Sequence, residues 1–475
     1  MVALIALFHF ILVLVFTVRI LLRDDLSPPA RLAWFIVLNV LPYLGSVVYF
    51  LFGEIDLGHK ADKRHAEVFS EIRAKAAPFM GHPDHAAIDP AFQPATRYAA
   101  SINGFHPVSG NRAELMADAA ETRDRLVADI DAATDHVHVL YYIWLTDNTG
   151  TALAEALIRA AKRGVTCRAM ADGLGSRALV KSELWRRMDA AGVQLAVAMP
   201  LDNLIGTLLT SRIDLRNHRK ITVVDGRITW CGSQNSADPE FRVKPKFAPW
   251  IDIMLRFTGP VVTQNQILFA SDWMQATGEN LDVIPLPEQP DEGGFPAQVM
   301  GDGPTERMGA TPQLFSTLIA CAREELVLST PYFVPDATVL EALRAAALLG
   351  VAVTLIFPER NDSWIVAAAS HSYYHNLLEA GCIIHEYRGG LLHAKTLTID
   401  GRLSLIGSTN LDLRSFDLNY ENNILLQDEA TTGAIRARQA AYISSARQVT
   451  REDLREWSYP RRIWNNVIAT IGPVL

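Results

Sequence analysis

Two stretches of the sequence carry the same reactive side chains at the same spacing. The first is HRKITVVDGRITWCGSQN, from His218 to Asn235, and the second is HAKTLTIDGRLSLIGSTN, from His393 to Asn410. His, Lys, Asp, Gly, Ser and Asn recur at matched positions, 175 residues apart. A nucleophilic imidazole, an ammonium group and neutral hydrogen-bond donors are suited to chemistry on a tetrahedral anion, whose negative charge they stabilise. The duplication therefore predicts two halves that serve one reaction.

Each stretch is expected to form a β-hairpin. The β-branched run after His-x-Lys is typical of a strand, in which the histidine and the lysine project from the same face. Asp225-Gly226 and Asp400-Gly401 are signals for a two-residue turn, and the second strand then delivers Gly-Ser-x-Asn. One copy alone would fit a surface hairpin with a stray histidine, whereas two copies at matched spacing argue against that interpretation.

The duplicated pattern resembles the signature of the phospholipase D superfamily, and nearly the whole chain is similar to bacterial cardiolipin synthases. The segments that support this include YYIW (141–144), DGLGS (172–176), WIDIMLRFTGPVV (250–262), STPYFVPD (329–336) and GSTNLDLRSFDLNYENN (407–423). The resemblance implies a phosphatidyl transfer through a phosphohistidine, without a metal or another cofactor. One phosphatidylglycerol would donate its phosphatidyl group to the glycerol of a second one.

The same resemblance implies roles for individual residues. The catalytic set is His218, Lys220, Asp225, His393, Lys395 and Asp400. The substrate-binding set is Ser233, Asn235, Ser408 and Asn410. His218 is the expected nucleophile and His393 the expected acid and base, but the two motifs are nearly symmetric and the reverse stays open. Asp225 and Asp400 lie at the predicted turns, so a structural role is as compatible with their position as a chemical one.

Each histidine also needs an acceptor on its second ring nitrogen to fix the tautomer. By resemblance, we expect Asp252 to orient His218 and Glu421 to orient His393. The alternative for each carboxylate is an ordinary place on the protein surface.

Two apolar segments near the start of the chain, residues 2–22 and 32–52, are each long enough to cross a bilayer. They predict a transmembrane hairpin within residues 1–55. The alternative for the first segment is a cleavable signal peptide, but it lacks a basic start. Basic residues follow the second segment, namely Lys60, Lys63, Arg64, Arg73 and Lys75. The positive-inside rule then predicts a multi-pass protein of the bacterial inner membrane, with the rest of the chain in the cytoplasm.

The remainder of the chain shows a repeated alternation of helix and strand patterns. Residues 56–106 are interpreted as a connector, 107–279 as the first half, 280–297 as a linker rich in Pro, Gly and acids, and 298–475 as the second half. The predicted fold is therefore two pseudo-symmetric, phospholipase D-like α/β halves sharing one active site, preceded by the transmembrane hairpin.

Composition limits the partners. A net charge of −8 disfavours nucleic acid, and hence a nuclease, whereas 49% hydrophobic residues and the apolar segments favour a bilayer and anionic phospholipids such as phosphatidylglycerol. The four cysteines have no CxxC pair and are expected to be reduced core residues. An oligomer is possible. The alternative functions are a phospholipase D-type hydrolase and a non-catalytic membrane scaffold, which would need degenerate motifs.

Two segments remain open between core packing and contact with the membrane. The first is an insert at 198–215 that the second half lacks, and the second is the C-terminal stretch RRIWNNVIATIGPVL (461–475).

Overall fold

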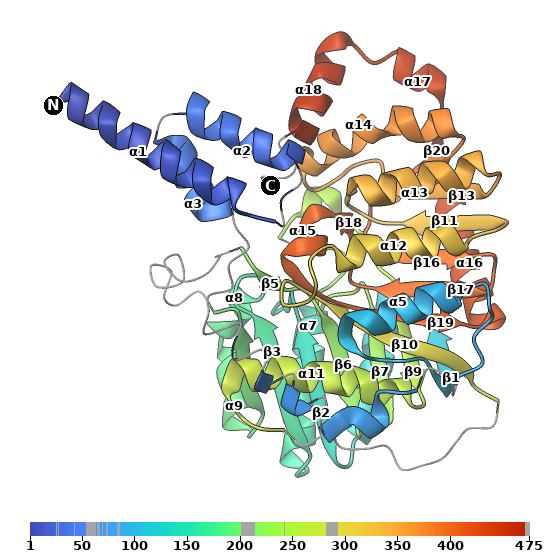
Figure 1. The fold of residues 1–475 in the computed structure, drawn as a ribbon. Coiled ribbons are helices and arrows are strands. Elements are labelled where there is room, and N and C mark those ends of the chain that lie inside the picture. Colours follow the sequence, from blue (N-terminus) through green and yellow to red (C-terminus); the bar gives the residue numbers. More distant parts are fainter. Residues whose placement is uncertain are drawn as a thin grey trace.

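Two halves with the same order of elements form most of the computed structural model, in which one mixed sheet runs through both (Figure 1). The structure describes the chain except for residues 25, 27, 42, 54–62, 64–66, 69, 73–74, 83–85, 201–213, 242, 282–292 and 471–475. Most of the predicted insert at 198–215 and most of the predicted linker at 280–297 lie outside the described residues. The last residues of that predicted linker already belong to β10.

The elements of the first half are β1 (Val108–Leu115), α6 (Ala119–Ala132), β2 (His136–Tyr141), α7 (Asn148–Lys162), β3 (Thr166–Asp172), α8 (Arg177–Val180), α9 (Glu183–Ala190), β4 (Gln194–Ala198), β5 (Arg216–Asn217), β6 (Lys220–Val224), β7 (Ile228–Gly232), β8 (Trp250–Ile251), β9 (Met254–Thr258) and α11 (Val261–Thr277). Residues 261–274 of α11 are all buried.

The elements of the second half are β10 (Phe295–Asp302), α12 (Ala310–Cys321), β11 (Glu325–Ser329), β12 (Phe333–Val334), α13 (Ala337–Leu348), β13 (Ala352–Pro358), α14 (Trp364–Ala380), β14 (Ile383–Tyr387), β15 (Leu391–Leu392), β16 (Thr396–Ile399), β17 (Leu403–Gly407), β18 (Leu411–Asp412), α15 (Leu413–Asp417), β19 (Asn419–Gln427), α16 (Glu429–Ser444), β20 (Ala446–Val449), α17 (Arg451–Arg455) and α18 (Tyr459–Thr470). Before the first half, α5 (Gln93–Asn103) packs on α12 and β10, so the end of the predicted connector belongs to the second half's core.

The strand order shows that the halves are a structural repeat. The first half reads β4-β3-β2-β6-β7-β9-β1, and the second reads β14-β13-β11-β16-β17-β19-β10. In both, the first three strands are parallel and the following neighbours are antiparallel. Antiparallel pairing of β1 with β10 joins the halves into one sheet. The predicted mixed α/β fold with two repeated units is therefore confirmed.

Both predicted motif hairpins are present, as β6–β7 and β16–β17. Each turn has two consecutive residues with positive φ: Asp225 and Gly226 at 51° and 61°, and Asp400 and Gly401 at 51° and 63°. A turn whose two central residues both have positive φ matches the right-handed twist of the strands, which is why Asp-Gly is favoured there. The register leaves one further residue in each connection, because Val224 faces Ile228 and Ile399 faces Leu403.

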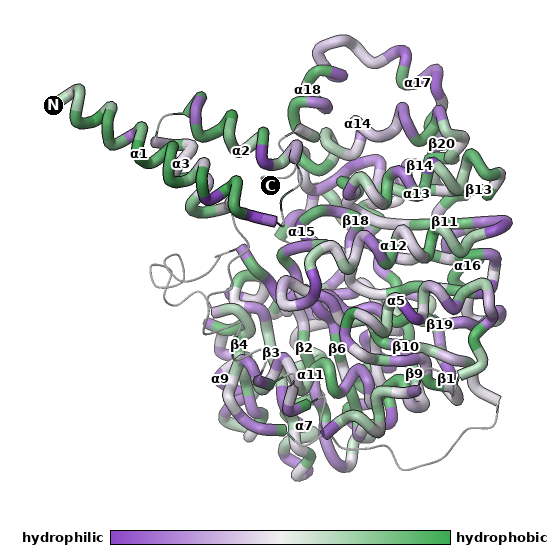
Figure 2. Tube along the Cα trace, in the orientation of Figure 1, coloured by the Kyte–Doolittle hydropathy of each residue, from purple (hydrophilic) through white to green (hydrophobic). Residues whose placement is uncertain are grey.

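The N-terminal region corrects one part of the predicted fold. α1 (Val2–Leu21) contains a stretch, Ala3–Leu21, that is long and apolar enough to cross a membrane, with mean hydropathy 2.6 and 6% of it buried. Figure 2 shows that most of this helix is apolar. The predicted second span at 32–52 is instead two helices, α2 (Pro28–Val40) and α3 (Leu44–Phe52). At 1.5 Å per residue these reach about 20 and about 14 Å, short of the ~30 Å hydrocarbon core.

Close packing accounts for this break. α3 folds back against α2, and a Cβ added at Gly45 would lie 2.3 Å from the carbonyl oxygen of Val37. Trp34 and Tyr49 stack edge to face between the two helices at 5.1 Å. The two-helix transmembrane hairpin is therefore not confirmed, and the described residues contain one helix that meets the length and hydropathy of a span.

Candidate active site

Each motif histidine is held by a strand from the opposite half. β5, just before His218, pairs in parallel with the start of β19, and the His218 N–H donates to the Tyr420 carbonyl at 2.9 Å. β15, just before His393, pairs in parallel with β8, and the His393 N–H donates to the Ile251 carbonyl at 2.8 Å. The two motifs therefore meet at a centre built by both halves.

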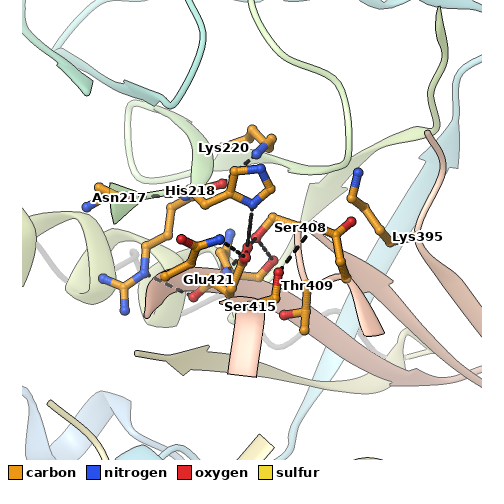
Figure 3. A network of polar contacts seen from close by, with 12 residues as sticks. Asn217, His218, Lys220, Lys395, Ser408, Thr409, Ser415 and Glu421 are labelled. Carbon is orange, nitrogen blue, oxygen red and sulfur yellow. Dashed lines mark hydrogen bonds and ion pairs between the residues drawn. The ribbon is translucent and has the colours of Figure 1, made fainter. Parts of the chain in front are cut away.

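This crossing exchanges the predicted carboxylate partners. His218 Nδ1 lies 2.8 Å from Glu421 Oε2, and His393 Nδ1 lies 2.6 Å from Asp252 Oδ1. Figure 3 shows the Glu421 carboxylate facing the His218 ring. The expected pairs, Asp252 with His218 and Glu421 with His393, were wrong because each histidine follows a strand that pairs with the other half. Both carboxylates do contact a motif histidine, as expected, and neither lies on the surface.

The motif serines bind the same carboxylates. The Ser233 hydroxyl donates to Asp252 Oδ1 at 2.6 Å, and the Ser408 hydroxyl donates to Glu421 Oε2. The backbone N–H groups of Ile253 and Asn422 donate to the two serine hydroxyls, at 3.1 and 2.9 Å. The serine protons are thus directed to the carboxylates, whereas the sequence predicted donation to a substrate oxygen. A serine of one half therefore holds, by a hydrogen bond, the carboxylate that orients the histidine of the other half.

The two motif lysines are buried and share one geometry. Lys220 Nζ donates to the His218 carbonyl at 2.5 Å, and Lys395 Nζ donates to the His393 carbonyl at 2.7 Å. An ammonium group has three donors, so two N–H bonds of each remain for an anion. Burial lowers the pKa of Lys220 to about 8 and that of Lys395 to about 7, although Glu421 and Asp252 oppose the shift.

The motif asparagines are also buried at the centre. Asn235 Oδ1 accepts a hydrogen bond from the Ile143 N–H at 3.2 Å, and Asn410 Nδ2 donates to the Ser415 hydroxyl at 3.2 Å. These contacts fix each amide beside its motif, and contact of either amide with a substrate oxygen stays a prediction.

The motif aspartates lie at the opposite ends of the hairpins. The Asp225 carboxylate accepts hydrogen bonds from the N–H groups of Thr134, Asp135 and His136. The Asp400 carboxylate does the same for Arg323, Glu324 and Glu325. Asp225 is five residues after Lys220, about 17 Å along the strand direction at 3.3 Å per residue. These contacts tie the turn to the loop before β2 or β11, which is a structural role.

Sequence reasoning missed several residues that border the histidines. The Tyr142 ring lies edge-on to His218 at 4.9 Å, and the Trp250 ring lies 4.5 Å from His393. Both belong to segments that carry the family resemblance, but an aromatic residue beside a strand is most often core. Arg219, inside the first motif, donates to the carbonyls of Glu421 and Asp302 and pairs with Asp272. The second motif has Ala394 at that position.

Comparison with known proteins places this geometry in a family. A family model described as "Cardiolipin synthase, PLD-like domain" matches residues 126–245 and 315–441. Cardiolipin synthase A of Proteus mirabilis (strain HI4320) is 34% identical over 98% of this chain and 97% of its own. Cardiolipin synthase A of Edwardsiella ictaluri (strain 93-146) is 34% identical over 97% of this chain and 95% of its own. The chain belongs to the cardiolipin synthase family.

Two further matches concern the N-terminal helices and the fold. A model described as "Phospholipase_D-nuclease N-terminal" covers residues 11–54, which include most of α1 and all of α2 and α3. The crystal structure of a phosphatidylserine synthase from Haemophilus influenzae Rd KW20 superposes with a TM-score of 0.59 at 15% identity, covering 82% of this chain and all of that one. That likeness shows a shared fold.

Within this cardiolipin synthase fold, the two histidines differ electrostatically. Burial lowers the pKa of His218 well below its ordinary value, and the charges of Lys220 and Lys395 lower it further. Burial and Lys395 also lower the pKa of His393, but Asp252 opposes them. Burial alone would raise the pKa of Asp252, yet His393 and Lys395 hold it at about 2, whereas burial raises the pKa of Glu421. His393 therefore faces the carboxylate with the lower pKa. Among the described residues, no cluster of His, Cys, Asp or Glu could hold a metal ion.

Proposed function

We propose that this chain transfers a phosphatidyl group from one phosphatidylglycerol to the terminal hydroxyl of another, giving cardiolipin and free glycerol. As a member of the cardiolipin synthase family the chain is a phosphatidyltransferase. The observation that carries the proposal is the pair of complete motifs, each with its histidine on a buried carboxylate from the other half.

In the first step the unprotonated Nε2 of His218 attacks the phosphorus of the donor lipid. Nδ1–H of His218 donates to Glu421, which leaves the Nε2 lone pair free. The bond from phosphorus to the glycerol oxygen breaks, and His393 gives that oxygen its Nε2 proton. Lys220, Lys395, Asn235 and Asn410 surround the non-bridging oxygens and stabilise their charge. The products of this step are phosphatidyl-His218, neutral His393 and free glycerol.

In the second step the same groups work in reverse. The acceptor hydroxyl gives its proton to Nε2 of His393 and attacks the phosphorus. The bond from phosphorus to His218 breaks, which restores the free imidazole. Water at the acceptor position would give phosphatidic acid by the same route, so exclusion of water decides between transfer and hydrolysis.

The division of roles rests on the electrostatics of the two histidines. A nucleophile must be unprotonated, and the depressed pKa of His218 supports this state. An acid must hold its proton until the leaving group departs, and the ionised Asp252 favours protonated His393. The negative charge of a bound phosphodiester raises the pKa of both rings and of both lysines, so donor binding itself favours the protonated form of His393.

We place α1 across the bacterial inner membrane, with both catalytic halves in the cytoplasm. The support is the apolar length of α1 and the basic residues that follow residue 52 in the sequence. This location supplies phosphatidylglycerol laterally from the membrane.

Lipid mass spectrometry on the purified protein tests the proposal directly. The protein is given phosphatidylglycerol in mixed micelles, with His218→Ala as the control. We expect cardiolipin and free glycerol in equal amounts from the native protein and neither from the variant. Formation of phosphatidic acid without cardiolipin would contradict the proposed transfer and show that the protein hydrolyses its donor lipid. The absence of any product from folded protein would contradict the proposal and leave a non-catalytic membrane scaffold.

A further inference from the structure

The C-terminal helix α18 leaves most of its large apolar side chains exposed, while its inner face buries one apolar and one polar residue. Tyr459, Ile463, Trp464 and Val467 are between 49% and 79% exposed and recur at the spacing of one helix face. On the inner face, Ile468 packs on α14 beside Asn465, and each is 4% exposed. A helix that packs in water shows the opposite pattern. Core packing, one of the two interpretations of this segment, therefore fails for the four exposed residues.

Two exposed tryptophans enlarge this apolar face. Trp464 stacks on Trp364, the first residue of α14, with ring centroids 5.8 Å apart and an angle of 16° between the rings. Trp364 is itself 62% exposed. Tryptophan and tyrosine are enriched where protein meets the headgroup layer of a bilayer, because their rings are apolar with one polar atom. We name Trp364, Tyr459, Ile463, Trp464 and Val467 the α18 face.

α18 itself carries positive charge. It contains Arg461 and Arg462 and no acidic residue. Behind it, α14, α17 and α18 border a polar cavity of about 560 Å³, whose charged lining residues are Arg451, Arg455, Arg462 and Glu379. Arginines beside an apolar helix face complement the phosphates of an anionic bilayer.

The α18 face also lies on the side of the molecule where a lipid substrate must arrive. Figure 1 shows α18 and α1–α3 at the same upper end of the molecule. Asp362, two residues before Trp364, accepts a hydrogen bond from the Tyr332 hydroxyl at 2.8 Å and pairs with Lys244 at 2.7 Å. Lys244 belongs to the loop that leads to Trp250, whose ring contacts His393. The segment at the start of α14 thus contacts the loop that carries Trp250.

We propose that the α18 face lies on the membrane surface, with its aromatic and aliphatic side chains at the boundary between the headgroups and the acyl chains of an anionic bilayer and Arg461 and Arg462 at the phosphates. The catalytic halves then have two attachments to the bilayer, α1 and the α18 face. This second attachment fixes the orientation of the active site, which α1 alone would leave free to rotate.

The depth of a label on α18 tests this proposal. The four native cysteines are buried, so an environment-sensitive fluorophore can be placed on Ile463→Cys in the full chain. The matched control is Leu349→Cys, at the end of α13, where the native side chain is 84% exposed and lies outside the α18 face. Both proteins are reconstituted in vesicles of phosphatidylglycerol and phosphatidylethanolamine and quenched with aqueous iodide or with nitroxide-labelled lipid.

We expect the label at 463 to show blue-shifted emission, quenching by the lipid nitroxide and loss of quenching by iodide, while the label at 349 shows the reverse. Equal iodide quenching at the two positions would overturn the proposal. Protection from iodide without quenching by lipid would also overturn it, because residues 471–475 or a second copy would then cover the face. The measurement needs no turnover, so it can fail or succeed independently of the proposed reaction.

Discussion

The two halves share one fold and one motif, yet they place their histidines in different surroundings. His218 faces Glu421, whose pKa is raised by burial, and lies beside the buried Arg219–Asp272 pair. His393 faces Asp252, whose pKa is about 2, and its motif has Ala394 where the other has Arg219. The duplicated backbone brings the same groups together twice, and the carboxylates from the opposite halves make the two histidines unequal.

This difference teaches how a repeat can divide one reaction into two roles. A symmetric pair of imidazoles would have equal affinity for a proton, and neither would be set as acid or nucleophile. An ionised carboxylate favours the protonated imidazole, whereas a carboxyl group with a raised pKa does so less. The crossed pairing also makes the halves interdependent, because each half contributes one histidine and the partner of the other.

Replacing the histidines should give the largest effects and separate the two roles. His218→Ala is expected to reduce turnover to background with any donor, because no covalent intermediate can form. His393→Ala is expected to lose about 10²–10⁴-fold with phosphatidylglycerol, the usual contribution of a general acid. A donor that carries p-nitrophenol in place of glycerol needs no acid, so release of p-nitrophenol should recover in His393→Ala alone. Recovery in His218→Ala alone would reverse the assignment.

Replacing the carboxylates should separate the same two roles, with smaller losses of activity. In Asp252→Asn the neutral amide no longer favours protonated His393, and each pKa unit lost costs about tenfold in the glycerol-releasing step. Glu421→Gln should instead slow attack by His218. Rapid-quench kinetics with phosphatidylglycerol and with the p-nitrophenyl donor measures the rate of leaving-group release in each variant. The p-nitrophenyl donor should rescue Asp252→Asn and leave Glu421→Gln impaired, and rescue of both or neither would contradict the crossed pairing.

The lysines predict the alkaline limb of the pH profile. Lys395 and Lys220, with pKa values of about 7 and about 8, must be protonated to bind the phosphodiester. Their charge is lost as pH rises through these values, so kcat/KM should fall above about pH 7. Lys395→Arg keeps its charge at any working pH, and it should move this limb upward even where the maximal rate drops several-fold. An unchanged limb in Lys395→Arg would exclude Lys395 as its origin.

The turn aspartates should affect stability more than chemistry. Asp225→Ala removes the acceptor of three backbone N–H groups, which costs about 1–3 kcal/mol for each donor left unsatisfied in a buried site and less where water replaces it. We expect a lower unfolding midpoint in urea, and a kcat within a few-fold of native for the protein that stays folded. Asp400→Ala is the matched variant in the other half. A kcat loss as large as that of His393→Ala would indicate a chemical role.

The sequence was sufficient for the features that depend on local chemistry and on repetition. The repeat predicted two α/β units, and Asp225-Gly226 and Asp400-Gly401 predicted both hairpin turns. The sequence could not predict that each histidine pairs with a carboxylate from the other half. Asp252 and Glu421 occupy similar places after their motifs, and no local pattern indicates which histidine each one contacts. The predicted span at residues 32–52 was also not confirmed, because hydropathy alone does not reveal that α3 turns back on α2 at Gly45.

Mapping the covalent intermediate tests the central claim most directly. The native protein is mixed with phosphatidylglycerol, quenched within a single turnover under conditions that preserve phosphohistidine, digested and sequenced by mass spectrometry. The account predicts a phosphatidyl group on His218 and an unmodified His393. A phosphatidyl group on His393, or on both histidines in comparable amounts, would contradict it and show that the two halves are chemically interchangeable.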